Sequence, residues 1–544
     1  MQKIVKGIIA SLLLFLLIST FSTLGYASQP GDVNEDGEIN IFDMILLAEY
    51  IVGSTNEDIS MEIADVNGDG VVDIHDMILI ARYIVGEIDE FPVEVETDPP
   101  PGSLEINIDE SITHQEIEGF GGSIAYYSSW LSDHPNKDEI YDLLFIDLGV
   151  DVLRLKNWIH DSRYGYQADQ WDEDVEWDAV EEDFDYAAED IVYNANERRD
   201  DPLKIKMTTW TPHPDLKSNN SPVGGTLRQE NGNYVYDEYA EYWLESLERY
   251  SEIGIEPDYL SIQNEPDFET DYESCLFDPQ ESQNAASYTQ AFEAVYEKLS
   301  NNLDEMPTML GPDVVGIGYN NVQQYVDELD HSILDGIAFH LYHGGDNDQD
   351  PHPPSFSDNL NDLVQQYPDL PKYQTEFYRG DAFNTAWTMH TNLTEGNVSM
   401  YLYWDLIWAE NGLITVENPW VDEPDYDGEP WTTEDGYWTT DSYYAVKHFA
   451  GYIEPGYQRV EASSEANDVE VSAYISPDED SMTVVMLNTG HSQETVHLDI
   501  DGFSIISSEV YRTDWQNEET ESISLGDGYS VEMPAESIVT VVLN

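Results

Sequence analysis

Two glutamates that end short apolar runs are the residues of this chain best suited to chemistry. Glu265 lies at the end of the stretch 259–266, YLSIQNEP, and Glu376 near the end of 372–378, KYQTEFY. Both runs have the composition of buried parallel strands, and Pro266 prevents the first from continuing. Ligands of alternating strand and helix proteins bind at the carboxyl ends of the strands, so both carboxylates should face one cleft. Paired carboxylates in a cleft are typical of glycoside hydrolysis, although a lone glutamate there can be an ordinary loop residue or an N-cap partner.

The elements that would position these carboxylates are predicted from apolar runs that alternate with helical segments. Helical periodicity is clear over 239–252 and 285–299. With the glycine-rich stretch at 118–123, the apolar runs give eight strands and predict an α/β fold, a (β/α)8 TIM barrel over 104–455. The glycines of 118–123 are expected to let the backbone approach a ligand. The other predicted strands are 150–155, 205–209, 259–263, 308–311, 336–340, 372–375 and 400–404.

A two-residue hydrophobic period marks a further domain. It occurs in 104–108, LEINI, and returns in 469–474, 482–488 and 538–543, where turn residues separate the runs. Such alternation is typical of half-buried antiparallel strands and predicts a C-terminal side β-sandwich over 456–544. The strand over 104–116 is predicted to pair with that sandwich.

An acidic repeat near the N-terminus predicts calcium binding. Two loops repeat with a period of 33 residues, with oxygen-bearing side chains at positions 1, 3, 5, 9 and 12 and glycine at position 6. This pattern matches calcium loops of the EF-hand type; the alternative is a pair of acidic turns without metal. An apolar helix follows each loop, over 44–53 and 77–86, so a small all-α domain with two Ca2+ ions is predicted over 30–87. The candidate ligands are Asp32, Asn34, Asp36, Asn40, Asp43, Asp65, Asn67, Asp69, Asp73 and Asp76.

Composition restricts partners and compartment. Twenty basic residues against 111 acidic ones give a formal net charge of −91, which argues against binding to nucleic acid or to an anionic membrane. Residues 1–27 have two lysines, an apolar run and small residues at the end, as a secretory signal peptide does, so secretion is predicted. Cys275 is the single cysteine, which excludes an intrachain disulfide. The proline-rich segment 88–103 is predicted to be a semi-rigid linker.

The calcium repeat resembles a type I dockerin, because neither loop follows a helix of ordinary length and position 12 is Asp. The resemblance implies that the partner is a cohesin module of a scaffoldin and that the protein is extracellular and cellulosome-associated. The family usually has small hydroxylated residues at loop positions 10 and 11. Here these positions hold Ile41-Phe42 and Ile74-His75, which leaves the cohesin specificity open.

The span from Leu104 to Asn544 resembles glycoside hydrolase family 30, with a leaning to its bacterial xylanase branch. The resemblance implies a retaining mechanism with Glu376 as nucleophile and Glu265 as acid/base, and no cofactor for catalysis. The motifs that carry it are GFGG at 119–122, LRL at 153–155, WTP at 210–212, QNEP at 263–266, FHLY at 339–342, TEF at 375–377, YW at 403–404 and PAESIVT at 534–540.

Further site residues are predicted around the two glutamates. Arg154 is expected to keep Glu376 ionised by its opposite charge. The pKa of Glu265 should be raised while Glu376 is charged and fall once the glycosyl ester neutralises that charge. The alternatives are a structural ion pair for Arg154, core packing for the tryptophans and an orienting role for His340. The predicted substrate-binding residues are Asn264, Arg154, Trp210, His340, Tyr342, Trp404, Tyr126, Trp158 and Tyr378.

The function predicted from these features is that of a secreted retaining endo-β-1,4-xylanase with a monomeric catalytic unit. Glucuronoxylanases of the family have an arginine just after strand eight, whereas this chain has Asp405 and Glu410, which would repel a glucuronate. Lys156 and Arg379 are the nearest cations that could offset this repulsion. An exo-acting xylobiohydrolase, a relative acting on β-glucosides and a non-catalytic carbohydrate-binding scaffold component are the alternatives.

Overall fold

The chain divides into two compact units, Met1–Asp98 and Pro99–Asn544. The predicted signal peptide and most of the predicted linker lie outside the described residues. Among the residues that are described, no helix is both long and apolar enough to cross a membrane. The computed structural model describes residues 30–34, 39–51, 59–64, 66, 72, 74–85, 88, 99–100, 102–158, 185–343, 353–378, 381–409, 412–420, 431–503, 505–514, 521–526 and 529–544.

The first unit is helical, as predicted. It contains α2 (Ile41–Ile51), α3 (Met61–Ala64) and α4 (Ile74–Val85). Helices α2 and α4 follow the two calcium loops and contact each other. Their inward residues, such as Leu47 and Ile80, are fully buried. The apolar side of each helix is thus covered by the helix from the other half of the repeat.

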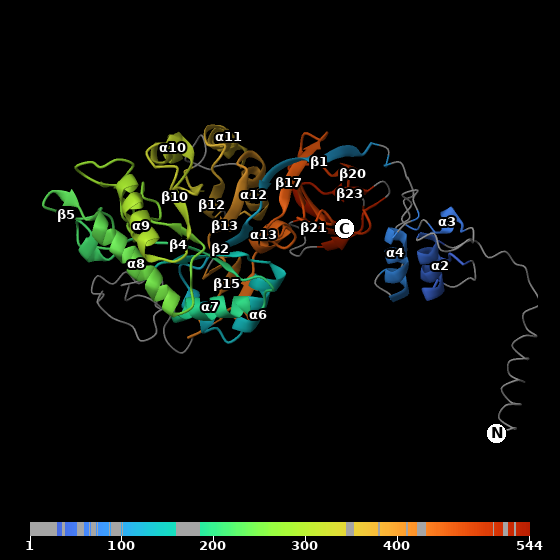
Figure 1. Ribbon diagram of the computed structural model, residues 1–544, viewed down its shortest axis with the longest axis horizontal. Helices are drawn as coiled ribbons and strands as arrows, with labels where there is room; N and C mark the ends of the chain where they lie inside the picture. Colours follow the sequence, from blue (N-terminus) through green and yellow to red (C-terminus); the bar gives the residue numbers. More distant parts are fainter. Residues whose placement is uncertain are drawn as a thin grey trace, which may run out of the picture. The chain divides into compact units, whose positions relative to one another are not determined.

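The second unit is built around a closed barrel of parallel strands, which confirms the predicted fold class (Figure 1). The last barrel strand pairs with the first and closes the ring. In the described part of the chain, the barrel strands are β2 (Gly119–Ser123), β3 (Val152–Lys156), β4 (Lys204–Thr208), β7 (Tyr259–Ser261), β10 (Thr308–Val314), β11 (Gly336–His340), β12 (Lys372–Phe377) and β13 (Val398–Tyr403).

Amphipathic helices pack their apolar sides against the barrel. In α8, the buried residues Tyr239, Trp243, Leu247 and Tyr250 recur every three or four positions, which forms one continuous apolar stripe. Ser287 caps α9 by accepting a hydrogen bond from the Gln290 N–H. The helices of this unit are α5 (Ser128–Ser132), α6 (Lys137–Asp142), α7 (Tyr186–Asn196), α8 (Tyr236–Glu252), α9 (Tyr288–Asn302), α10 (Asn321–Val326), α11 (Ser357–Gln366), α12 (Ala382–Glu395) and α13 (Asp441–Ala450).

The glycines of β2 serve strand packing. A β-carbon at Gly121 would lie 1.8 Å from the carbonyl oxygen of Val152 in β3. One at Gly122 would lie 2.6 Å from the carbonyl oxygen of Tyr403 in β13. The glycines were expected to bring the backbone close to a ligand, but these contacts give another reason for their presence. They let β2 lie close to both of its neighbours where the barrel closes.

A β-sandwich follows the barrel and includes β1 (Leu104–Glu116), as predicted. In its sheet, β1 lies between β17 and β20. Buried Ile106, Val471, Val484 and Val541 belong to its apolar core. Helices α12 and α13 contact this domain from the barrel side (Figure 1). Its other strands are β17 (Gln458–Ser464), β18 (Val469–Ile475), β19 (Met482–Asn488), β20 (Glu494–Asp501), β21 (Ser508–Asp514), β22 (Glu521–Ile523), β23 (Ser530–Met533) and β24 (Ser537–Leu543).

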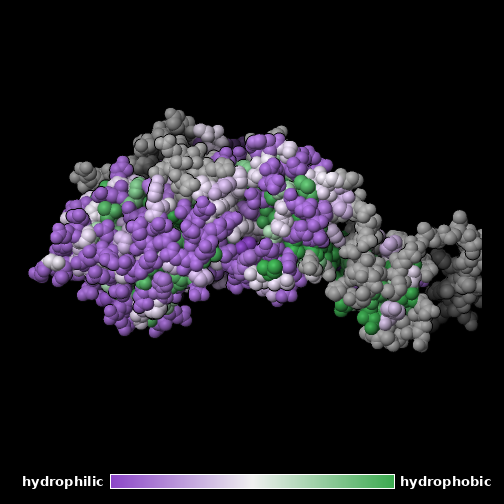
Figure 2. All heavy atoms as spheres, turned by 90° about the horizontal axis from the view of Figure 1, so that it is seen from above, coloured by the Kyte–Doolittle hydropathy of each residue, from purple (hydrophilic) through white to green (hydrophobic). Residues whose placement is uncertain are grey.

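The surface of the second unit reflects the composition of the chain. Figure 2 shows that most of the visible face of this unit is hydrophilic. With 111 acidic residues in the chain, carboxylates dominate the charge. Such a surface keeps a large domain soluble but adds self-repulsion that salt screens.

Candidate active site

Asn264 and Glu265 lie in the segment that follows the short barrel strand β7, and two residues separate them from its end at Ser261. The Asn264 N–H donates to the Thr209 carbonyl at 2.8 Å, and the Glu265 N–H donates to the Asp313 carbonyl at 2.9 Å. Glu265 has φ of 44°, in the left-handed region that residues with a β-carbon seldom adopt. Such backbone is concentrated at functional sites, where the surrounding structure holds it in place.

The two glutamates meet at the carboxyl ends of β7 and β12. One carboxylate oxygen of Glu265, one of Glu376 and a ring nitrogen of His340 all lie within 4.8 Å of one another. Glu265 is 5 % exposed and Glu376 is 6 % exposed. Both carboxylates therefore face one nearly dry space, in the arrangement expected from the two strand ends.

Arg154, from β3, links Glu376 to Asn264. Its guanidinium forms a hydrogen-bonded ion pair with Glu376 and donates to Asn264 Oδ1 at 2.6 Å. The guanidinium carbon also lies 4.8 Å from the ring centre of Trp210. Arg154 is fully buried, so little solvent weakens its attraction for the carboxylate. The same contact occupies the amide oxygen of Asn264 and leaves its NH2 group to donate on the pocket side.

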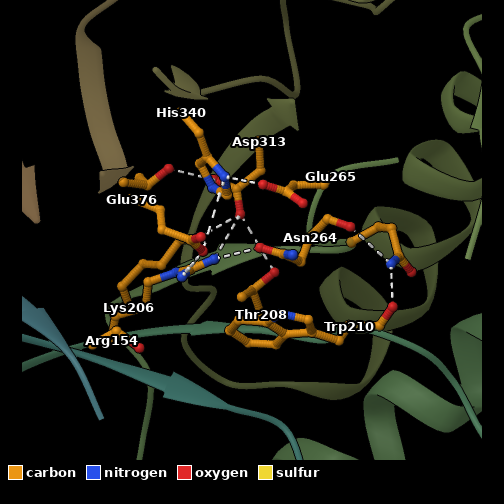
Figure 3. A network of polar contacts seen from close by, with 12 residues as sticks. Arg154, Lys206, Thr208, Trp210, Asn264, Glu265, Asp313, His340 and Glu376 are labelled. Carbon is orange, nitrogen blue, oxygen red and sulfur yellow. Dashed lines mark hydrogen bonds and ion pairs between the residues drawn. The ribbon is translucent and has the colours of Figure 1, made fainter. Parts of the chain in front are cut away.

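His340, from β11, contacts both carboxylates. Its Nδ1 lies 3.0 Å from Glu265 Oε1 and 3.9 Å from Glu376 Oε2 (Figure 3). Burial alone would lower the pKa of His340, but the charge of Glu376 and contacts with Asp313 and Glu265 outweigh it and raise the pKa to about 9. The ring therefore adds a positive charge between the two glutamates at neutral pH.

The environment of Glu265 favours its protonated form. Burial raises its pKa to about 7; the hydrogen bond from His340 opposes this rise and the charge of Glu376 adds to it. Glu376 instead has the Arg154 guanidinium as a direct partner. A buried carboxyl that favours its protonated form and a carboxyl paired with a buried cation can divide the roles of proton donor and nucleophile.

A second layer of charge lies beneath this pair. Asp313, from β10, accepts hydrogen bonds from Lys206 Nζ at 2.7 Å and from the Thr375 hydroxyl. It also lies 3.8 Å from Arg154 and 3.6 Å from the Nε2 atom of His340 (Figure 3). Asp313 and Lys206 are both fully buried. The sequence prediction missed both residues, although a charge inside an apolar run, as in IKMT at 205–208, was the available signal.

A pocket of about 390 Å³ opens above the two glutamates. It includes five of the predicted substrate-binding residues and five residues that the prediction missed. The predicted ones are Tyr126, Trp210, Asn264, Tyr342 and Trp404. The missed ones are Phe268, Tyr272, Val315 and His343, which lie in loops after barrel strands, and Trp408, which ends the short strand β14 (Ile407–Trp408); none carries a pattern that separates it from its neighbours.

Four predicted residues do not line this pocket. Arg154 and His340 lie behind it, in contact with the glutamates. Trp158 is 7 % exposed and belongs to the large apolar core, with Lys156 Nζ 3.5 Å from its ring centre. Tyr378 is half-buried, and its ring lies 6.2 Å from that of Tyr403.

A buried ion pair supports the aromatic wall of the pocket. Lys156 Nζ lies 2.9 Å from Glu273 Oε1, and the Tyr126 hydroxyl donates to Glu273 Oε2 at 2.7 Å. The Tyr126 ring makes edge contacts with Trp210, Trp404 and Trp408 at centroid distances of 6.2, 6.1 and 6.0 Å. Glu273 thereby fixes the ring around which the three tryptophans are arranged.

The predicted repulsion of glucuronate by Asp405 is wrong. Asp405 is 2 % exposed and is not among the residues that line the pocket. Burial raises the pKa of Asp405 well above its usual value, which disfavours the charged form that the predicted repulsion needs. Glu410, the other residue in that prediction, lies outside the described residues, as does Arg379. Lys156 is buried and paired with Glu273, so it does not offer a free charge to a ligand.

Some of the predicted calcium ligands lie in the described part of the first unit. Asp43 and Asp76 are fully buried, and each accepts a main-chain N–H of its own loop: Asn34 and Asn40 for Asp43, Val66 for Asp76. A carboxylate at position 12 that folds back over its loop fits a calcium site. Asp32, Asn34 and Asn40 are also described; Asp36, Asp65, Asn67, Asp69 and Asp73 lie outside the described residues.

Sequence comparisons match both ends of the chain. A family model for the dockerin type I domain matches residues 30–85, and one for the glycosyl hydrolase family 30 beta sandwich domain matches residues 456–541. Putative glucosylceramidase 1 of Caenorhabditis elegans is 26% identical over 430 residues, which are 73% of this chain and 78% of that protein. Lysosomal acid glucosylceramidase of Mus musculus is 24% identical over 331 residues, 57% of this chain and 61% of that protein.

Solved structures share the fold of the second unit. The glycoside hydrolase family 30 subfamily 8 xylanase Xyn30A of Clostridium acetobutylicum has a TM-score of 0.59 and 21% identity, covering 81% of this chain and 99% of that one. Xylanase C of Talaromyces cellulolyticus has a TM-score of 0.61 and 20% identity, covering 81% and 100%. The two resemblances inferred from the sequence are confirmed: the chain carries a calcium-binding type I dockerin and the β-sandwich domain of glycosyl hydrolase family 30, joined to a barrel with the fold of solved family 30 xylanases.

Proposed function

We propose that this chain is a secreted, cellulosomal glycoside hydrolase that cleaves β-1,4-xylosidic bonds of xylan with retention of anomeric configuration. The observation that carries the proposal is the pair of buried glutamates with carboxylate oxygens within 4.8 Å. Retaining enzymes hold their carboxyl groups about 5–5.5 Å apart and inverting enzymes about 6.5–9.5 Å apart, because inversion needs room for a water molecule. The short separation favours retention.

The residues divide the reaction as follows. Glu376, paired with Arg154, attacks the anomeric carbon and forms a glycosyl ester, while Glu265 gives its proton to the leaving oxygen. Forming the ester removes the charge of Glu376, and with it one cause of the raised pKa of Glu265. Glu265 then acts as a base toward the water that hydrolyses the ester. The NH2 group of Asn264 is placed to donate to the sugar 2-hydroxyl.

The pocket supports xylan as substrate and an activity that does not need glucuronate. Its aromatic lining suits stacking against sugar rings, and the solved structures of similar fold include xylanases. Among the described residues, no lysine or arginine lines the pocket. A uronate bound there would find Glu265 and Glu376 but no cation on the described surface.

A second candidate is hydrolysis of β-glucosides. The relatives found by sequence are named glucosylceramidases, and the C. elegans protein matches over 430 residues. The retaining pair would serve either sugar, since the difference is one exocyclic hydroxymethyl group. Side-by-side kcat/KM values on aryl β-xylobioside and aryl β-glucoside decide between them, and xylosidic preference supports the first proposal.

The proposal is tested by product analysis on linear and glucuronate-substituted xylan. Retention is expected by NMR of the first product formed, and linear xylan should be cleaved at least as well as the substituted polymer. A tenfold or greater loss of kcat/KM on removing the uronate would refute the glucuronate-independent reading. Release of xylobiose alone from the start would instead indicate the exo-acting alternative.

Replacement of the two glutamates separates an enzyme from a carbohydrate-binding component. Glu376→Ala should abolish turnover, and azide should not restore a retained product, whereas Glu265→Ala with azide should yield a glycosyl azide of retained configuration. Tyr378→Phe, which changes a residue outside the pocket lining, serves as the matched control. If wild-type protein binds xylan but releases no sugar, the non-catalytic reading is correct.

For the first unit, we propose that the dockerin holds two Ca2+ ions through the ten predicted ligands and binds a cohesin. The buried, loop-closing carboxylates of Asp43 and Asp76 support one ion in each half of the repeat. Calcium titration by isothermal calorimetry should give two ions per chain.

A further inference from the structure

Asp313 contacts charged or hydroxyl side chains of four other barrel strands, and the proposed reaction assigns it no role. Asp313 lies in strand β10. Its neighbours are Lys206 and Thr208 of β4, Arg154 of β3, His340 of β11 and Thr375 of β12. Asp313 is fully buried. Burying a charge is costly, and apolar residues can often replace a buried ion pair without loss of stability. A buried carboxylate with this many polar neighbours therefore indicates a specific role.

We infer that Asp313, paired with Lys206, is a positioning residue that keeps the His340 ring doubly protonated, so that Nδ1–H donates to Glu265 and the acid proton stays on the other carboxyl oxygen. The inference rests on the proposed function, because it concerns the proton that Glu265 gives to the leaving group. Neither Asp313 nor Lys206 touches the pocket, so both act through His340.

The geometry around His340 shows why its charge state matters. Nδ1 is at hydrogen-bond distance from Glu265 Oε1, 3.0 Å, whereas Nε2 lies 3.6 Å from Asp313 Oδ1 and has no hydrogen-bond partner among the described residues. A neutral ring with its proton on Nε2 would have a lone pair on Nδ1. That lone pair would accept the proton of Glu265 and draw it away from the substrate. The cation has no lone pair and can only donate.

The charges near His340 favour the cation. Carboxyl groups of Glu265, Glu376, Asp313 and Asp267 and the hydroxyl of Tyr342 surround the ring, and Arg154 and Lys206 lie beyond Asp313. Burial raises the pKa of Asp313, but Lys206, His340 and Arg154 outweigh it and hold it well below its usual value. Burial lowers the pKa of Lys206 to about 7 despite Asp313. Lys206 and Asp313 are assigned as ionised, because each lies 2.7 Å from the opposite charge of the other.

The proton balance of the step follows from this arrangement. As the bond from the anomeric carbon to the leaving oxygen breaks, Glu376 forms the ester bond. The proton on Glu265 moves to the leaving oxygen, and His340 retains both of its own protons. With Asp313→Asn the ring loses one of the counter-charges that outweigh its burial, and a neutral ring with its proton on Nε2 then competes for the proton of Glu265. The defect should therefore be larger for leaving groups that need protonation than for those that do not.

The first test compares two leaving groups on the full-length protein. With Asp313→Asn, kcat/KM for phenyl β-xylobioside should fall by about 10²-fold or more, in the range of general acid catalysis. For 2,4-dinitrophenyl β-xylobioside, which leaves without a proton, the loss should be less than about tenfold. Thr208→Val removes a weak contact to Asp313 but leaves its charge, so both substrates should change equally. Equal losses on both substrates in Asp313→Asn would overturn the inference.

A second measurement does not depend on activity, and its wild-type part does not depend on the fold of Asp313→Asn. Ring-13C histidine is introduced into wild-type protein, and the His340 signal is assigned by its absence in His340→Gln. The signal should keep the imidazolium shift at pH 7, and in Asp313→Asn it should move to the neutral shift. A wild-type His340 that is neutral at pH 7 would refute the inference. If wild-type protein cleaves neither aryl xylobioside, the proposed function fails. The 13C shift still decides whether Asp313 keeps the His340 ring doubly protonated.

Discussion

At the scale of single residues, the site depends on two chemically identical side chains in different environments. Glu376 has an arginine as its hydrogen-bonded partner, and Glu265 has burial and a neighbouring carboxylate. The sequence predicted both glutamates because each interrupts an apolar run. It missed Asp313, although a charge inside an apolar run was an available signal, and it could not predict Trp408, since the role of a single aromatic ring depends on the strands that surround it. Trp158 and Trp404 both follow strands, yet only Trp404 lines the pocket.

The raised pKa of Glu265 predicts the alkaline limit of activity. An acid with a pKa of about 7 is protonated below that pH, so kcat/KM should fall as the pH rises through about 7. The pH profile of phenyl β-xylobioside hydrolysis provides the measurement. His340→Gln removes the bond that lowers this pKa, so its alkaline limb should move to higher pH. A wild-type limb near pH 4.5 would contradict the role of burial at Glu265.

At the scale of elements, the barrel could be predicted because period and composition mark each strand. Seven predicted strand cores coincide with β3, β4, β7, β10, β11, β12 and β13 to within a few residues. Small pairs such as β5 (Gln229–Glu230) with β6 (Asn233–Tyr234) were not predicted, because two residues carry no period. Their positions follow from packing between loops, which a linear pattern does not contain.

Lys156, at the end of β3, forms a buried ion pair with Glu273, in the loop after β7. The effects of replacing these two residues on stability should therefore be coupled. Glu273→Gln removes one charge of a pair whose members are 3 % and 1 % exposed, so the free energy of unfolding should fall by about 3 kcal/mol. The KM for xylan should rise, because Tyr126 loses its charged acceptor. Urea denaturation and xylan kinetics provide the measurements.

The double variant Lys156→Met/Glu273→Gln should recover most of that stability, since no single charge remains buried. The surface pair Lys298–Glu241, 31 % and 50 % exposed, is the matched control. Glu241→Gln should leave stability unchanged within error. A double variant that is less stable than Glu273→Gln would show that the pair stabilises the fold beyond mutual neutralisation.

At the scale of the whole molecule, His448 joins the barrel to the sandwich and predicts an acid limit. From α13, its ring nitrogens lie 2.8 Å from Thr540 Oγ1 and 2.9 Å from Thr513 Oγ1, and burial lowers its pKa to about 3. Below pH 6.5 the unfolded chain binds this proton and the folded chain does not. Stability should therefore fall as pH falls from 6.5 toward 3, by up to about 1.4 kcal/mol per pH unit from this residue.

Urea denaturation at several pH values between 3.5 and 7 gives the slope. His448→Gln should reduce it, whereas His491→Gln should not, because the His491 side chain is 93 % exposed. An unchanged slope in His448→Gln would assign the acid sensitivity to other groups, such as buried His390, whose pKa burial lowers to about 4.

The division into two units predicts the effect of chelation. EDTA should unfold residues 30–87 and abolish cohesin binding, because calcium binding and folding are coupled in such domains. Xylan hydrolysis should persist, since the glutamates, the pocket and their supporting residues all belong to the second unit. Circular dichroism, cohesin pull-down and reducing-sugar release follow the three quantities. Loss of hydrolysis together with cohesin binding would contradict this independence.

The place of β1 in the sandwich has a mechanical consequence. The chain enters the second unit at this strand, which pairs with β17 on one side and with β20 on the other, from Leu104 opposite Val496 to Asp109 opposite Asp501. Tension on the preceding segment acts along β1, so these ladder bonds are sheared together and do not open one after another. A pull on the proposed scaffold tether should therefore load the sandwich before the barrel strands that hold the glutamates.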